Sequence, residues 1–391
     1  MASNASGQQP GSPPAEARAA DPPPQPSAPP PEPTFVDKAR QWADDTKIVE
    51  RLAGTTDGWY PRLGGIRRGS GIGGGPGYRM HFGNDMLLDV SGAMSVRNYK
   101  AFDVRVRWLQ APAQRAELWT DYGFDDFTEE RFFGLGETTV QDARTTYGFR
   151  NNTVALRGVL RPVRRLEISG RVALMRPRLN SGSDTEYRRT NEVLSDPQAP
   201  GLALQPNFVQ TQVAFDFDAR DAPGYPTRGG FYRVAFARWD DRDLNAFDFR
   251  RVDVLGTHYV PLTANKQHML SGRFGFTSAT ADTGARVPFY FLPSVGGSDT
   301  IRSFADYRFS AENVLWYGAE YQWTPRPYVS LDTFVDLAKV ARTWGGLGSA
   351  DTKKGYGFGV IGHTSKQTLA RIDFGFGGGE GWNVWISFGR F

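Results

Sequence analysis

Apolar and polar residues alternate with a period of two along most of the chain after about residue 58. The alternation is clear in residues 102–108, 166–174, 209–217 and 315–323. In the first of these stretches every second residue is apolar, namely Phe102, Val104, Val106 and Trp108. Such a pattern predicts β-strands with one apolar and one polar face. The strands run to about 9–11 residues, the length that a tilted strand needs to cross a bilayer, whereas strands of soluble proteins average about 5–6.

Short polar or proline-containing turns alternate with long or glycine-rich loops. Seven short turns fall near residues 83–85, 111–113, 161–163, 222–224, 261–265, 325–327 and 364–366. Eight longer loops fall at about 67–76, 97–101, 123–145, 176–207, 239–246, 278–314, 341–355 and 377–381. Together these connections imply sixteen strands, and an even strand number with short turns on one side is typical of outer-membrane barrels. We therefore expect an all-β fold over residues 57–391, a sixteen-stranded antiparallel transmembrane β-barrel.

The N-terminal residues differ from this pattern. Residues 1–34 are rich in proline, alanine and serine, which predicts a disordered segment because too little apolar surface is available for burial. Residues 35–53 predict a short amphipathic helix, since apolar residues recur at helical spacing and Gly54 follows; the series includes Phe35, Trp42 and Val49. Two interpretations of this helix stay open, a periplasmic linker or a plug in the barrel mouth.

Composition narrows the function classes. The 391 residues include 45 Gly and 27 Phe, and this abundance favours β-structure. There is no cysteine, which excludes disulfides and thiolate metal sites. The net charge of +4 is too small for this length to indicate a nucleic-acid partner, so we expect none.

Candidate catalytic residues are few. The four histidines have no spacing that suggests a nucleophile, a base and an orienting group; they are His81, His258, His268 and His363. No cluster has metal-ligand spacing. The glycine triplets at 73–75 and 377–379 lack the lysine and hydroxyl residues of a phosphate-binding loop. The sequence therefore predicts no enzyme activity, no metal and no cofactor.

One arginine lies in a Gly/Ser-rich segment within the long loop at 278–314, here called loop six. The string reads Gly296-Gly297-Ser298-Asp299-Thr300-Ile301-Arg302-Ser303-Phe304. It resembles the loop-six signature, roughly (V/I/L)-R-G-(F/Y), of the outer-membrane superfamily that includes BamA-like assembly proteins and two-partner secretion transporters, also called the bacterial surface antigen family. Ser303 stands where that family usually has glycine. The string Phe334-Val335-Asp336-Leu337-Ala338 resembles the family's F-x-D-x-G element, with Ala338 in place of glycine.

The resemblance implies a structural site. In the family, loop six folds back into the barrel and its arginine meets the aspartate of the later strand on the lumen wall. The corresponding residues here are Arg302 and Asp336, with Gly296, Gly297, Ile301 and Phe304 around the arginine. A desolvated arginine needs an acidic or carbonyl partner, so we expect this pair to fix the position of the loop without performing chemistry.

The resemblance also implies a function at the outer membrane of a Gram-negative-type bacterium. The barrel is expected to insert or translocate polypeptide, or lipid, through a weak seam between its first and last strands. The residues of this seam and of the C-terminal signal that the family's assembly machinery recognises are Gly64 and Gly65 near the first strand and Trp385, Phe388 and Phe391 near the last. Expected partners are outer-membrane lipid and lipopolysaccharide, and a polypeptide substrate or a separate periplasmic protein. The family usually carries periplasmic POTRA domains, and the residues before 57 are too few for one. The alternative is a stand-alone pore or structural barrel without translocase activity.

Overall fold

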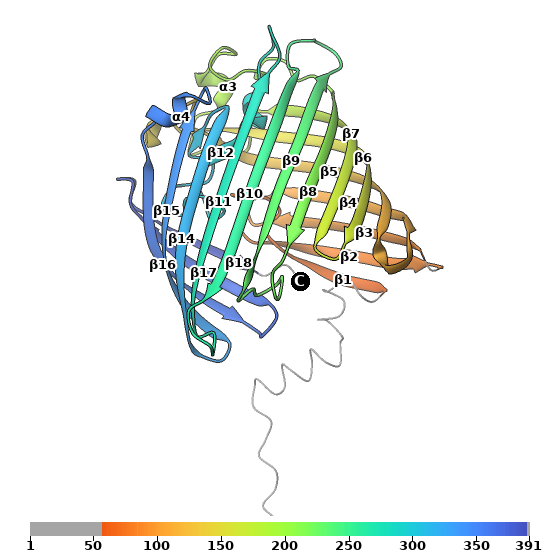
Figure 1. Cartoon of the computed structure of the whole chain (residues 1–391). Coiled ribbons are helices and arrows are strands. Elements are labelled where there is room, and N and C mark those ends of the chain that lie inside the picture. The colour runs from red at the N-terminus through yellow and green to blue at the C-terminus, as the bar shows by residue number, and fades with distance from the viewer. Residues whose placement is uncertain (1–56, 84, 389–391) are drawn as a thin grey trace, which may run out of the picture. The chain divides into compact units, whose positions relative to one another are not determined.

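The computed structural model describes residues 57–83 and 85–388, most of which form one antiparallel sheet of sixteen strands that curls into a barrel (Figure 1). The predicted all-β class and the strand number are therefore confirmed over this part of the chain. The expectations for residues 1–34, for the helix at 35–53 with Phe35, Trp42 and Val49, and for Phe391 fall outside the described residues.

The sixteen strands follow one another around the barrel in chain order, each pairing with the next. Their bounds are β1 Gly58–Gly64, β2 Gly73–Phe82, β3 Met86–Ser95, β4 Lys100–Gln110, β5 Ala116–Phe132, β6 Thr145–Val163, β7 Leu166–Asn180, β8 Phe208–Asp218, β9 Gly229–Asp241, β10 Phe249–Pro261, β11 His268–Ala281, β14 Asn313–Arg326, β15 Val329–Ala341, β16 Lys353–His363, β17 Thr368–Phe376 and β18 Trp382–Phe388.

Short elements occupy the connections. Loop six, which the sequence predicted at 278–314, spans residues 282–312 in the structure. It carries the two-stranded ribbon of β12 and β13, and the remaining elements are single helical turns. Their bounds are β12 Ser294–Val295, β13 Phe309–Ser310, α3 Thr190–Val193, α4 Gly346–Ser349, η1 Pro112–Gln114, η2 Gln141–Ala143 and η3 Phe289–Phe291. In the part of the chain that the structure describes, no helix has the length and apolarity required to cross a membrane.

Several strands are longer than the sequence predicts. β5 has 17 residues, β6 has 19 and β7 has 15. The loops predicted at 123–145 and 176–207 therefore shrink to 133–144 and 181–207. The prediction was wrong at these ends because both faces of the strands are polar or packed under loops there, so the period-two signal fades.

The alternating pattern sorts side chains between the outer wall and the lumen. Along β15, Leu331 and Val335 are exposed on the outer wall, whereas Asp332, Phe334 and Asp336 are buried on the lumen side. A transmembrane barrel shows lipid only every second residue, so its other face can be polar. The lumen side of β15 can therefore hold two carboxylates next to a phenyl ring.

Aromatic side chains cap the barrel at the long-loop end. The first part of loop six contributes Phe289, Tyr290 and Phe291, which pack against rings on β5, β6, β8 and β10. These partner rings are Phe132, Phe149, Phe208 and Phe249, with ring centroids 4.9–6.4 Å from their loop-six partners. The packing fixes the start of loop six across the mouth of the barrel.

The β8–β9 turn crosses the opposite, short-turn end. Its Tyr225 is buried, and its hydroxyl lies 2.9 Å from Ser330 Oγ and accepts a hydrogen bond from Gln322 Nε2 at 2.6 Å. The Tyr225 ring stacks on His363, with centroids 3.8 Å apart. Ser330 Oγ and His363 Nε2 are 2.9 Å apart, but the other ring nitrogen faces the carbonyl oxygen of Thr364 and Ser330 is fully buried. This contact therefore attaches the turn to the wall and lacks the carboxylate orienter of a catalytic triad.

Candidate functional site

Loop six lies inside the barrel, and two glycines allow its course. Gly296 and Gly297 both have positive φ, 119° and 90°. A Cβ on Gly296 would lie 2.1 Å from the carbonyl oxygen of Ala305, and one on Gly297 would lie 2.1 Å from Asp306 Oδ1. Only glycine fits both the backbone conformation and the space at these positions. Between them and Phe304 the chain makes a tight reversal that presents Arg302 to the lumen wall.

The Arg302 side chain is buried between loop six and β15. Its Nε donates a hydrogen bond to Asp336 Oδ2 at 2.8 Å, and its Nη2 donates to Asp336 Oδ1 at 3.1 Å. The backbone N–H of Arg302 adds a bond to Oδ2 at 3.2 Å. The guanidinium carbon lies 3.3 Å from the centroid of the Phe334 ring. Arg302 is 2% exposed and Asp336 is 0% exposed, so this bidentate pair is removed from water.

The pair is part of a larger network that sequence reasoning missed. Arg302 also reaches Glu320 on β14 at 2.9 Å and Asp373 on β17 at 3.5 Å. Arg371 on β17 binds the same two carboxylates at 2.6 and 2.8 Å. Further members are Arg273 on β11, 2.9 Å from Asp336, and Asp332, 3.2 Å from Arg371. Each of these residues is one of the alternate, polar positions of its strand. This alternation was the only feature of the sequence that could have placed them in the lumen.

Apolar contacts hold the residues on either side of Arg302. Ile301 and Phe304 are buried in a cluster with Val295 and Phe309 of loop six and Ala338 and Val340 of β15. Burial of two large side chains contributes about 3–6 kcal/mol in total, at roughly 1.5–3 kcal/mol each. The predicted residues Gly296, Gly297, Ile301, Arg302, Phe304 and Asp336 are thus brought together in one place.

Glycines on the lumen wall give loop six its space. A Cβ on Gly375 of β17 would lie 2.2 Å from the carbonyl oxygen of Arg302 and 2.9 Å from the backbone nitrogen of Ser303. A Cβ on Gly355 of β16 would lie 2.0 Å from Ser303 Oγ. The glycines of these two strands therefore allow the backbone of residues 302–303 to lie directly against the lumen wall.

A second buried arginine of loop six, Arg308, anchors the loop on the other side of the reversal. It is 1% exposed, binds Glu380 in the β17–β18 loop at 2.7 Å and donates to the carbonyl oxygen of Thr139 at 2.6 Å. Nearby, burial raises the pKa of the Asp306 carboxyl to about 6, while the positive charge of Arg131 lowers it. Arg308 was not predicted, because its partners Thr139 and Glu380 lie in two other loops.

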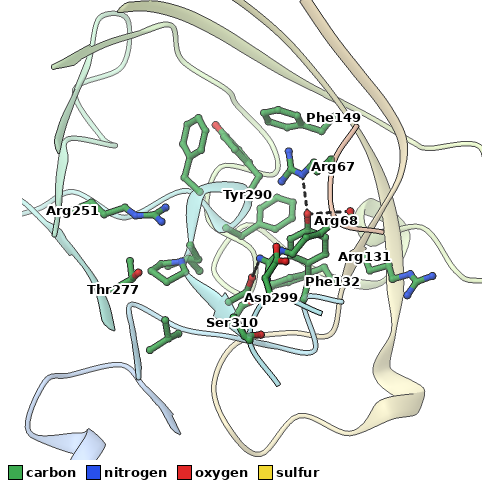
Figure 2. A pocket seen from close by; sticks show the side chains of 18 of the residues that line it. Arg67, Arg68, Arg131, Phe132, Phe149, Arg251, Thr277, Tyr290, Asp299 and Ser310 are labelled. Atoms are coloured by element: carbon green, nitrogen blue, oxygen red, sulfur yellow. Dashed lines mark hydrogen bonds between the residues drawn. The ribbon is translucent and has the colours of Figure 1, made fainter. Parts of the chain in front are cut away.

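The loop between β1 and β2 folds inward and binds loop six (Figure 2). Arg67 Nε donates to the hydroxyl of Tyr307 at 3.0 Å, and Tyr307 donates to the carbonyl oxygen of Arg68 at 3.3 Å. Arg68 also donates from Nη2 to Ser294 Oγ at 3.2 Å. Arg67 forms an ion pair with Glu130 of β5 at 3.1 Å. Loop six is therefore attached to the first loop as well as to the later strands.

The first and last strands approach each other without pairing. Cα atoms of β1 and β18 come within 8 Å, but in the described residues no register joins the two strands. β1 has seven residues, and β18 is described over Trp382–Phe388, up to the last residue that the structure describes. The predicted seam residues lie here: Gly64 ends β1 with a φ of 118°, Gly65 follows it, and Phe388 is exposed on the outer wall.

Trp385, predicted as a seam residue, points toward the lumen and contacts loop six. Its Nε1 donates to the carbonyl oxygen of Arg302 at 2.7 Å, and Asn383 Nδ2 donates to that of Ser303 at 2.8 Å. The last strand and the loop after the first strand are therefore both bonded to loop six. Within the described residues, this loop connects the two sides of the seam where backbone pairing does not.

Loop six also divides the lumen into two cavities. The cavity at the long-loop end has a volume of about 830 Å³ and is lined by arginines and aromatic rings (Figure 2). The cavity at the short-turn end has about 300 Å³ and is bounded by Tyr225. Arg273, Ser298 and Asp299 line both cavities. The described residues contain no group of three or more His, Asp or Glu side chains arranged to hold a metal ion.

Comparison with known proteins gives the following matches. A family model described as the Omp85 superfamily domain matches residues 142–387. The solved structure of BamA from Haemophilus ducreyi lacking POTRA domains 1–3 is similar, with a TM-score of 0.64, 13% identity, and coverage of 85% of this chain and 70% of that chain. CdiB from Escherichia coli gives 0.54 and 14%, covering 85% and 62%. CdiB from Acinetobacter baumannii gives 0.51 and 14%, covering 85% and 58%. No curated protein sequence matches significantly.

Proposed function

The chain belongs to the Omp85 superfamily of outer-membrane barrels, and from this premise we propose that it inserts or translocates polypeptide, or lipid, through the seam between β1 and β18. The substrate reaches the barrel from the periplasm, either alone or with a separate periplasmic partner protein. In this function the barrel contributes the strand edges of β1 and β18 and a lateral opening between them to the membrane. It contributes no reactive groups.

The unpaired seam is the observation that carries this proposal. An edge strand presents a row of free N–H and C=O groups, which can template an incoming strand. β1 is poorly suited to a stable ladder, because Pro61 has no N–H and Gly58 and Gly64 offer no side chains to pack. In the described residues the two edges are joined through loop six and not by a backbone ladder, so separating them breaks no strand pairing.

A disulfide across the seam tests the proposal. Cysteines are placed in β1 and β18 at the positions where the Cα atoms of the two strands approach most closely, since a disulfide needs Cα atoms within about 7 Å. Because the closed seam cannot admit a strand, we expect the oxidised protein to lose its ability to fold a barrel substrate into proteoliposomes, and reduction to restore it. A matched control joins Val260 to Leu270, which already face each other in the β10–β11 ladder. Full activity of the oxidised seam variant would contradict lateral opening.

The cavities of the lumen favour a second candidate, a stand-alone pore. Volumes of about 830 and 300 Å³ lie on the two sides of loop six, and a small shift of the loop would join them. Deletion of residues 1–53 separates the candidates in planar bilayers. A pore plugged by the N-terminal helix gains conductance on deletion. For a translocase we expect the conductance of the full chain to be low, and to stay low after the deletion, since loop six still divides the lumen.

A further inference from the structure

The outer wall formed by β5–β10 contains an apolar hollow of about 670 Å³. Gly158 on β6 and Gly170 on β7 face each other in register, and a Cβ on either would meet no heavy atom within 4 Å. The walls are aliphatic and aromatic side chains, namely Leu118, Leu156, Val172, Val213, Phe236 and Val252. Because this surface of the barrel faces the bilayer, hydrocarbon and not water fills the hollow.

Arginines border the hollow on the long-loop side. Arg238 on β9 and Arg250 on β10 are directly opposite in register, and both line the hollow. They share Asp282, at 3.0 and 2.9 Å, and Arg238 also bonds Asp240 at 2.6 Å. Two guanidinium groups and two carboxylates thus form a compact rim at the edge of the apolar surface.

Two further arginines on β7 give this face a surplus of positive charge. Arg176 and Arg178 lie on the same outward phase as Val172, toward the long-loop end. Arg178 is bonded to oxygens of Pro177, Gln205 and Asn207, all of them neutral. The backbone of Arg176 pairs with Asn152 in the β6–β7 ladder, but its side chain has no hydrogen bond or ion pair to any other described residue. The basic side chains of Arg176 and Arg178 therefore face the outer leaflet, next to the apolar hollow.

We propose that this hollow and its arginines bind lipopolysaccharide, a phosphorylated and multiply acylated glycolipid of the outer leaflet. An acyl chain occupies the space beside Gly158 and Gly170. The phosphates accept charge-assisted hydrogen bonds from the rim arginines and from those on β7, since the guanidinium fork matches phosphate oxygens. The two phosphates of lipopolysaccharide match the two pairs of arginines, Arg238 with Arg250 and Arg176 with Arg178. A phospholipid has only one phosphate for these two pairs. The site lies on β5–β10, well separated in strand order from the seam between β1 and β18.

Native mass spectrometry of the full chain in detergent tests the proposal, with deep-rough lipopolysaccharide and phosphatidylglycerol as probes. Filling the hollow with Gly158→Leu and Gly170→Leu is expected to weaken lipopolysaccharide binding about tenfold or more. The matched control is Gly272→Leu on β11, another outward glycine with no heavy atom within 4 Å of its Cβ position, and we expect no change. A second variant, Arg238→Gln with Arg250→Gln, is expected to weaken lipopolysaccharide binding to a similar extent. A heat-modifiable gel shift shows that each variant is folded.

Four results would overturn the site. The first is unchanged lipopolysaccharide binding in the filled variant, and the second is an equal loss in Gly272→Leu. The third is phosphatidylglycerol binding as tight as that of lipopolysaccharide. The fourth is a detergent-stable dimer that disappears when the hollow is filled, because the occupant would then be a second copy of the chain.

Discussion

Reversal of the charge at Arg302 is expected to release loop six from the lumen wall. Arg302→Glu would place a carboxylate among Asp336, Glu320 and Asp373, which are all within 3.5 Å of the present guanidinium. Breaking a buried ion pair in this way costs about 3–5 kcal/mol, because the remaining charge stays buried and unpaired. We expect a lower unfolding midpoint of the heat-modifiable band and new protease cleavage between Gly296 and Phe304.

A solvent-exposed ion pair provides the control for this prediction. The Arg342 side chain is 80% exposed and lies 3.9 Å from Glu312, so Arg342→Glu should change stability by less than about 1 kcal/mol. A neutral double-mutant cycle of Arg302→Gln and Asp336→Asn then isolates the coupling, expected at about 2–3 kcal/mol for a charged hydrogen-bonded pair. Additive effects in this cycle would show that the two residues do not act together. Swapping both charges should recover only part of the loss, because Arg273 would face a new arginine at position 336.

Adding one methyl group at Gly375 is expected to displace loop six while leaving every charge in place. The new Cβ of Gly375→Ala would lie 2.2 Å from the carbonyl oxygen of Arg302, and backbone atoms cannot move aside as a flexible side chain can. Overpacking of this kind costs about 1–3 kcal/mol or more. The contact of Trp385 with the same carbonyl should be lost as well, and the tryptophan emission should shift on exposure.

Gly158→Ala is the matched control for the methyl group, since its Cβ would meet no atom within 4 Å. We expect this variant to retain the protease resistance and unfolding midpoint of the parent. If Gly375→Ala were equally resistant to protease, the close approach of loop six to β17 would be wrong. Equal destabilisation by both alanines would instead indicate a general cost of replacing glycine in a strand.

The sequence predicted those parts of the structure that depend on local periodicity. The strand number follows from alternation and turns, and the position of Asp336 on the lumen side follows from its phase on β15. The partners Glu320, Arg371 and Asp373 were not predicted, because they come together only through the registers of three successive strand pairs, from β14 to β17. Arg308 and Tyr225 were missed for a related reason, since each is buried by residues from distant connections.

The first loop illustrates the same limit. Arg67 and Arg68 lie in a glycine-rich stretch that is typical of solvated loops, and nothing local distinguishes them from exposed charges. Their role depends on Tyr307 and Ser294, more than 220 residues later in the chain. Charge and composition can therefore indicate a barrel, whereas the contacts that hold its internal loop require the closed sheet.

The attachment of loop six has a consequence for the order in which the barrel is built. Arg67, Arg68 and Arg273 precede the loop in the chain, but Asp336, Asp373, Trp385 and Glu380 follow it. Arg302 and Arg308 therefore cannot make these later contacts until β15 to β18 have taken their places in the sheet. The loop can settle only after the C-terminal strands have joined the sheet, so its docking reports that the nascent barrel has reached its final strand.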